Sequence, residues 1–286
     1  MKILVTGAQG QLGSAVCQVL YRRGIPYFAA TRENFDLTDT AMLQAVLQQE
    51  QPTAILHCGA YTKVDLAERE RELCFLVNRD GTAFLADYCQ ESDLPMLYVS
   101  TDYVFSGEGT EPFETDSPIA PLNVYGESKA AGEQAVRSVV SKHFIVRTSW
   151  VFGGEGTHFV RTMQRLAKTH AVLRVVEDQF GSPTYVGDLA PLLCDMLCGQ
   201  HYGTYHATNE GTCSWAEFAR SILKASELAS TVEGISTADY PTTAKRPRNS
   251  RLSKTSLDAA GFLRLPGWQD ALRRYLHTQK REEPRE

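Results

Sequence analysis

The chain has 286 residues, of which 43% are hydrophobic and 22% charged, proportions that are ordinary for a globular protein with a buried core. Its formal net charge of −5 leaves no basic excess to attract a nucleic-acid backbone or an anionic membrane, so neither is expected as a partner. No stretch reaches the roughly 20 apolar residues that span a bilayer, and the N-terminus lacks the apolar region and cleavage site of a signal peptide.

Short β-branched or apolar runs alternate with longer amphipathic segments in the first half of the chain, which is typical of an α/β fold. Because these runs are hydrophobic throughout, we expect strands that helices cover on both faces. Right-handed crossovers then give a Rossmann-like, doubly wound parallel sheet. The expected strands are residues 2–6, 27–30, 53–58, 96–100 and 144–148, and the expected helices are residues 11–23, 40–51, 66–90 and 124–140.

After about residue 150 the alternation loosens, and DQFGSPTYV, GTYHATNEGTCSW and KRPRNSRL mix turn-forming residues, aromatics and arginines. We therefore predict a nucleotide-binding domain with the catalytic residues over 1–150. A smaller, mainly substrate-binding lobe is expected over 151–286, with segments that return to the first domain. The final QKREEPRE is charged and nearly free of apolar residues, which predicts a frayed end.

Glycines follow the first expected strand and open the first expected helix, where VTGAQGQLG has the spacing GxxGxxG rather than GxGxxG. The physical demands of both spacings are the same: a tight turn, close approach of the backbone to a pyrophosphate, and a helix N-terminus that favours anions. A purely structural turn also needs glycine, but the start of a βαβ unit favours a cofactor site. Its expected contacts are Gly7, Gly10, Gln11, Leu12 and Gly13.

The second expected strand ends without the acidic residue that binds the ribose of NAD. The chain reads YFAATREN, so Ala30 and Thr31 occupy these positions and Arg32 follows. A guanidinium suits a 2′-phosphate, although an exposed loop arginine is the competing interpretation. We therefore predict NADP(H) as cofactor, with NAD(H) tolerated. Asp36 is either a further cofactor contact, together with Leu37, or part of a helix cap.

The segment NVYGESKAAGE places Tyr125 four residues before Lys129 in the expected helix 124–140, so both side chains lie on one face. Alone, this pair would usually be a helix surface. A nearby ammonium, however, favours the phenolate and brings a phenol of pKa about 10 closer to useful proton transfer. Reduction of a ketone needs such a donor, because the carbonyl oxygen gains a proton as hydride reaches the carbon.

A third group is expected to hold that oxygen. The strand ending YVSTDYVF supplies Ser100 and Thr101 at its carboxyl end, where ligands of doubly wound sheets bind. We choose Thr101 for this role. In this order, the glycine turn, the hydroxyl and the YxxxK pair indicate an enzyme.

These motifs together resemble the extended short-chain dehydrogenase/reductase family, and most of all its reductases of nucleotide-linked 4-keto sugars. The resemblance implies NADP-dependent reduction of a nucleotide sugar in the biosynthesis of surface polysaccharides. It extends over nearly the whole chain. The supporting segments are HCGAYTKVDLAE, STDYVFSGEGTEPFETD, PLNVYGESKAAGE, RTSWVF, DQFGSPTYV and RPRNSRL.

The resemblance also implies the role of each site residue. Tyr125 becomes the proton donor, Lys129 the group that tunes it and bonds the nicotinamide ribose, and Thr101 the holder of the carbonyl. The stretch that lies against the cofactor after the third strand corresponds to Ala60, Tyr61 and Thr62.

The implied substrate contacts are Thr101, Asp102, Tyr125 and Trp150, although a tryptophan there is also a fair candidate for the core. Arg248 and Arg251 could bind the nucleotide diphosphate, and surface salt bridges are an equally good interpretation of both. Asn78 resembles a helix asparagine that many relatives use for backbone bonding, and we interpret it as structural.

Two features bear on metals and location. Ala15 stands where certain relatives carry a glutamate connected with a divalent metal at a dimer interface, so we predict no metal. The seven scattered cysteines form no CxxC pair, which indicates neither a disulfide framework nor a zinc site and suits a reducing cytoplasm. A monomer or a homodimer is expected.

Two other functions compete with reduction. The first is a nucleotide-sugar epimerase or 4,6-dehydratase of the same fold, but the dehydratase pattern has a glutamate where Tyr103 follows Asp102. The second is a noncatalytic regulatory subunit, because the fold also resembles the β subunit of methionine adenosyltransferase. Such a subunit would have little need of Tyr125, Lys129 and Thr101.

Overall fold

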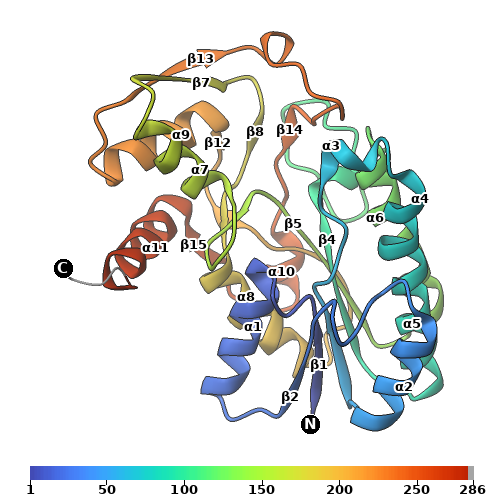
Figure 1. Cartoon of the computed structure of the whole chain (residues 1–286). Coiled ribbons are helices and arrows are strands. Elements are labelled where there is room, and N and C mark those ends of the chain that lie inside the picture. Colours follow the sequence, from blue (N-terminus) through green and yellow to red (C-terminus); the bar gives the residue numbers. More distant parts are fainter. Residues whose placement is uncertain (283–286) are drawn as a thin grey trace.

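The computed structural model describes residues 1–282 and has a parallel sheet of six strands at its centre (Figure 1). The strands lie in the order β10-β5-β4-β3-β1-β2. The chain adds β2 on one side of β1 and β3 on the other, so the strand order switches between β1 and β3, as in a doubly wound sheet. The predicted Rossmann-like fold is therefore confirmed. The strands are β1 Ile3–Thr6, β2 Tyr27–Ala30, β3 Ala54–His57, β4 Met96–Thr101, β5 His143–Thr148 and β10 Gly203–His206.

Helices cover both faces of this sheet because alternate strand residues point to opposite sides (Figure 1). Ile3, Leu56 and Val146 share one hydrophobic cluster with residues of α1 and α8. Leu4 and Ile145 belong to a second cluster on the other face, with residues of α2, α5 and α6. The helices are α1 Gln11–Arg22, α2 Thr40–Glu50, α5 Gly81–Glu91, α6 Val124–Val139 and α8 Val186–Leu197.

The second half of the chain adds a separate hydrophobic cluster around Phe218 and Trp268, between α7, α9 and α11. Two of its segments nevertheless join the first layers: β10 pairs with β5, and α8 packs against α1. A domain boundary near residue 150 stays a prediction. The other strands and α-helices of this half are β6 Val151–Phe152, α7 Phe159–Ala167, β7 Val172–Val176, β8 Phe180–Gly181, β9 Thr184–Tyr185, β11 Asn209–Glu210, β12 Cys213–Ser214, α9 Trp215–Ala225, β13 Thr231–Ile235, β14 Asn249–Ser250, α10 Thr255–Ala259, β15 Leu265–Gly267 and α11 Trp268–Glu282.

The single helix expected over residues 66–90 is wrong. The chain forms α3 (Val64–Ala67), α4 (Arg71–Phe75) and a π-helical turn (Leu76–Asp80) before α5 begins. The wider turn contains Asn78, which is buried and bonds the loop after β3 and helix α6. A π turn at such a position is typical of functional sites, and hydrophobic periodicity does not reveal it.

The C-terminal end also differs from expectation. Helix α11 continues to Glu282, so the first residues of QKREEPRE are helical rather than frayed. Residues 283–286, to which the same prediction applied, lie outside the described residues.

Candidate active site

The glycine turn brings three segments into close contact. Gly7 has a φ of +65°, and a Cβ on it would lie 2.8 Å from the Cα of Gly59 in the loop after β3. A Cβ on Gly13 would lie 2.2 Å from the carbonyl oxygen of Gly7. Helix α1 starts after Gly10 without a side-chain cap, so its first N–H groups are available to an anion.

A cavity of ≈ 380 Å³ lies beside this turn, at the point where the strand order reverses. Gly10, Gln11, Leu12 and Gly13 do not line it and instead form the start of α1. Seven predicted cofactor contacts do line it: Gly7, Arg32, Asp36, Leu37, Ala60, Tyr61 and Thr62.

The Arg32 edge of this cavity carries a loosely held pair of charges. The Arg32 side chain is 81% exposed, with its Nε 3.4 Å from Oδ2 of Asp36. Asp36 also accepts hydrogen bonds from the backbone N–H and the hydroxyl of Thr38, at 2.9 and 2.8 Å. The cap of α2 is Asp39, which accepts from the Met42 N–H. The guanidinium is therefore able to turn toward a second anion.

The first turn of helix α6 packs against the turn that follows β4. Its N-cap is Asn123, whose Oδ1 accepts from the Gly126 N–H at 2.8 Å and whose amide donates to the Lys245 carbonyl. A Cβ on Gly126 would lie 2.2 Å from the carbonyl oxygen of Tyr103, so only glycine permits this approach. Tyr125, which lies between the cap and the glycine, is thereby held over the end of β4.

The Tyr125 ring is partly buried and packs edge-on against Tyr103, with ring centroids 5.6 Å apart. Burial raises the pKa of Tyr125, the Asp102 charge raises it further, and the Thr101 hydroxyl lowers it. The prediction of a phenol made more acidic is therefore wrong, because burial raises its pKa. The raised pKa keeps the phenol protonated, which is the form that a proton donor needs.

Lys129 lies one turn further along α6 and is only 2% exposed. Its Nζ donates to the Val99 carbonyl of β4 at 2.8 Å and lies 3.9 Å from the centroid of the Tyr98 ring. Burial lowers the pKa of Lys129 to about 7, while the charge of Glu133 opposes this shift. The lysine thus ties the helix to the strand below Tyr125.

Thr101 and Asp102 lie at the end of β4 beneath the phenol, as predicted. The Thr101 hydroxyl accepts from the Tyr103 N–H at 3.2 Å and donates to Oδ1 of Asp102 at 3.1 Å. Asp102 is 2% exposed, and burial raises its pKa to about 6, against the hydroxyls of Ser250 and Thr101, which lower it. The side chain is thus a weak acid near neutral pH.

Trp150 is held by a stack of aromatics and by its own backbone. Its φ is +50°, a conformation that is rare for a bulky residue. The centroid of its indole lies 3.6 Å from that of Trp215, and a Cβ on Gly181 would be 2.7 Å from the Trp150 ring. The tryptophan is therefore fixed, partly buried, against the hydrophobic cluster around Phe218 and Trp268.

The predicted diphosphate arginines lie on either side of β14. Arg248 is 69% exposed and forms a long ion pair with Asp178 at 3.7 Å. The guanidinium of Arg251 bonds Oδ1 of Asn249 at 3.0 Å and lies over the Phe180 ring. The salt bridge of Arg248 leaves most of its donors available to a ligand.

Sequence reasoning missed Arg246, the arginine that reaches Tyr103 in the turn after β4. Its guanidinium pairs with Asp65 at 2.5 Å and donates to the Tyr103 hydroxyl at 3.4 Å. The motif RPRNSRL signalled the cluster of arginines, but spacing does not show which of them turns inward.

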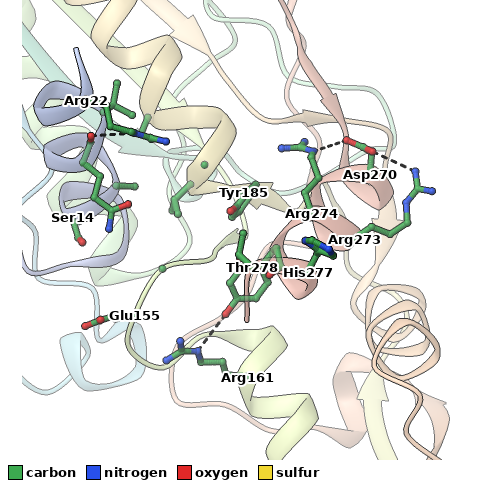
Figure 2. A pocket seen from close by; sticks show the side chains of 18 residues that line it. Ser14, Arg22, Glu155, Arg161, Tyr185, Asp270, Arg273, Arg274, His277 and Thr278 are labelled. Atoms are coloured by element: carbon green, nitrogen blue, oxygen red, sulfur yellow. Dashed lines mark hydrogen bonds and ion pairs between the residues drawn. The ribbon is translucent and has the colours of Figure 1, made fainter. Parts of the chain in front are cut away.

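A larger groove lies away from these residues, between α1, α8, α11 and the loop after β6 (Figure 2). Arg274 in this groove pairs with Asp188 and Asp270, and Arg161 donates to the Tyr275 hydroxyl. Ala15 lines the same groove. Among the residues whose side chains the structure describes, no cluster of three or more His, Cys, Asp or Glu side chains could hold a metal ion. No helix of the described part of the chain is both long and apolar enough to cross a bilayer.

The chain is similar to known proteins over nearly its whole length. Residues 1–281 match the family model described as RmlD substrate binding domain. The chain is 40% identical to a dTDP-4-dehydrorhamnose reductase of Aggregatibacter actinomycetemcomitans, over 95% of this chain and 97% of the other. It is 39% identical to the spore coat polysaccharide biosynthesis protein SpsK of Bacillus subtilis (strain 168), over 97% and 98%.

Solved structures give the same result. A dTDP-4-dehydrorhamnose reductase from Bacillus anthracis str. Ames in complex with NADP has a TM-score of 0.94 at 40% identity, covering 97% of this chain and 99% of the other. An ortholog from Clostridium acetobutylicum ATCC 824 has a TM-score of 0.95 at 34% identity, covering 98% and 100%. A UDP-glucose 4-epimerase from Thermus thermophilus has a TM-score of 0.84 at 23% identity, covering 99% and 100%, which shows the shared fold alone.

The buried Asp102 carboxyl should make stability depend on pH. Its pKa in the folded chain, about 6, lies above the ordinary value of 3.8, so folding favours its protonated form. The contribution is therefore fully present below about pH 4 and is lost as pH rises through about 6, by about 2–3 kcal/mol. Urea denaturation of the wild type and Asp102→Asn from about pH 4 to 7.5 should show the wild type losing this much relative to the variant. A constant difference would contradict the assignment.

Proposed function

The chain belongs to the RmlD substrate binding domain family, and from this membership we propose that it reduces dTDP-4-dehydro-β-L-rhamnose to dTDP-β-L-rhamnose with NADPH. This reaction would serve dTDP-rhamnose and surface polysaccharide biosynthesis. The observation that carries the proposal is the position of Tyr125 beside Thr101 at the end of β4, one turn of α6 from the buried Lys129. The relatives named dTDP-4-dehydrorhamnose reductase match this chain over nearly their whole length, which supports the same activity.

The described residues fit a bound NADPH. A Cβ on Gly7 or Gly13 would clash with backbone, and Oε1 of Gln11 is buried without a partner among the described residues. The pyrophosphate would lie at the start of α1, and Arg32 would reach the 2′-phosphate. Lys129 would bond the nicotinamide ribose. When bound, the cofactor supplies the hydride.

The chain's own residues perform the proton transfer and the orientation. Thr101 would hold the carbonyl oxygen, and Tyr125 would give it a proton as the carbon is reduced. The raised pKa of Tyr125 keeps this donor protonated at neutral pH. Trp150 and Asp102 would contact the sugar, and the exposed Arg248 the diphosphate.

Elimination of water is disfavoured as the main reaction. In this chain Tyr103 follows Asp102 where a second acid would be needed, and its hydroxyl accepts from Arg246. A regulatory role is disfavoured because the donor, the lysine and the threonine are all present at one site. The likeness to an epimerase rests on the fold alone.

Four further assignments belong to this proposal. A cytoplasmic location is supported by the seven cysteines, all of which are free. Nucleic acid is not expected to bind, because the net charge is negative. The active form would be a monomer or a homodimer, with residues 151–286 acting mainly on the substrate.

A substrate panel tests the proposed function. Thymidine- and uridine-linked 4-keto sugars are incubated with NADPH or NADH, and cofactor oxidation is compared with product stereochemistry. We expect one NADPH oxidised per thymidine-linked 4-keto-rhamnose consumed, with the rhamnose product. Conversion of a sugar without net oxidation of NADPH would identify an epimerase instead. If no sugar were converted, the proposed enzymatic activity would be refuted.

The exposed guanidinium of Arg32 should determine the choice of cofactor. In Arg32→Ala the NADPH dissociation constant should rise about 10-fold, because a charge-assisted contact with the 2′-phosphate is lost. The NADH constant should change little. Arg174→Ala, which removes an exposed arginine of β7, serves as the matched control. Equal losses of NADPH and NADH affinity in Arg32→Ala would exclude the phosphate contact.

A further inference from the structure

One face of α6 carries a continuous series of polar or charged side chains at four-residue spacing: Tyr125, Lys129, Glu133 and Arg137. The proposed function uses the first two. The next residue, Glu133, is 1% exposed and lies one turn beyond the lysine. It is a buried carboxylate on the catalytic helix to which the proposed mechanism gives no role.

The partner of Glu133 is a buried arginine in the sheet. Arg147 on β5 donates from Nε to Oε1 at 2.8 Å and from Nη2 to Oε2 at 2.7 Å, a bidentate geometry. Its remaining nitrogen donates to the Thr115 carbonyl at 2.9 Å and lies 3.2 Å from Nε2 of His206. The carboxylate therefore has one fixed position relative to the sheet and to Lys129.

Stability alone does not account for a buried pair of this kind. Withdrawing two charges from water often costs more than their attraction returns, and apolar residues of similar volume would stabilise the fold as well. A charge in a water-poor interior acts strongly on its neighbours, however. The nearest functional charge is the Lys129 ammonium, which burial drives toward the neutral form and which Glu133 stabilises.

Among the described residues, Glu133 is the one carboxylate that shifts the pKa of Lys129. The thiols of Cys58 and Cys74 also favour the charged lysine, but burial raises the pKa of both and keeps them neutral. The titratable groups around Lys129 and Glu133 are His57 on β3, Cys58 after β3, Cys74 on α4, Tyr98 on β4, Tyr125 and Arg137 on α6, Arg147 on β5 and His206 on β10.

Neither histidine of this group changes its charge near neutral pH. Burial lowers the pKa of both His57 and His206 to about 3. The charge of Glu133 is therefore the one that favours the ammonium form of Lys129 over the neutral amine.

We propose that Glu133, fixed by Arg147, is a positioning residue that holds Lys129 as an ammonium and so sets the alkaline limit of NADPH binding and of reduction. The bidentate bond to Arg147 keeps the carboxylate ionised and in place, one helical turn from the lysine. This inference rests on the proposed function, since that function gives Lys129 its role at the ribose.

The test measures the dissociation constant of NADPH against pH by fluorescence titration without substrate, and kcat/KM against pH with substrate. In Glu133→Gln the alkaline limb of both profiles should move down by about one pH unit, because an opposite charge near the lysine is lost. Since this variant leaves Arg147 without its partner, Glu133→Gln with Arg147→Gln provides a second variant without an uncompensated buried charge. It should shift the limb in the same direction.

Two variants serve as controls. Glu133→Asp keeps the negative charge, so the alkaline limb of both pH profiles should stay at its wild-type position. Arg137→Gln removes the half-exposed partner of Glu133, 3.3 Å from Oε2, and should leave the limb in place. Thermal melting checks that each variant is folded.

The outcomes separate this inference from the proposed function. A folded double variant whose binding profile keeps the wild-type limb would overturn the role of Glu133, even if its melting temperature falls. Lack of sugar reduction by the wild type at every pH would instead refute the proposed function.

Discussion

The attachment of α6 to the central sheet is the constraint on which the site depends. Two buried basic side chains contribute to it: Lys129 reaches from the helix to the Val99 carbonyl of β4, and Arg147 reaches from β5 to Glu133 on the helix. Each contact fixes the rotation of the helix about its axis. With that rotation fixed, Tyr125 in the first turn has to lie over the end of β4, next to Thr101.

Small residues make this attachment possible. A Cβ on Gly132 would lie 2.3 Å from the Tyr98 hydroxyl and 2.5 Å from the Asn78 carbonyl, so glycine lets α6 lie directly on the sheet and on the π turn. The Asn78 amide then donates to the Ser128 hydroxyl on α6 and to the carbonyl of Tyr61. These bonds join α6 to the loop that lines the cavity beside the glycine turn.

The sequence predicted the features that local chemistry determines. Continuous apolar runs indicated the parallel strands, and the glycine turn and the YxxxK pair indicated the residues of the candidate site. It could not predict features that depend on contacts between distant segments. The π turn at Asn78 is accompanied by bonds to Tyr61 and Ser128, and the inward turn of Arg246 by its pair with Asp65, none of which leaves a periodic signal. Spacing also misjudged the acidity of the Tyr125 phenol, because spacing does not reveal the burial that raises its pKa.

The central claim is that the Tyr125 hydroxyl donates the proton. Single-turnover oxidation of bound NADPH by the thymidine-linked 4-keto sugar, followed by the absorbance of the reduced nicotinamide, compares the wild type with Tyr125→Phe most directly. The rate should fall about 10²- to 10⁴-fold, the usual contribution of a general acid, while the NADPH dissociation constant stays within about twofold. A variant that keeps the wild-type rate would show that another group protonates the ketone and would contradict the mechanism.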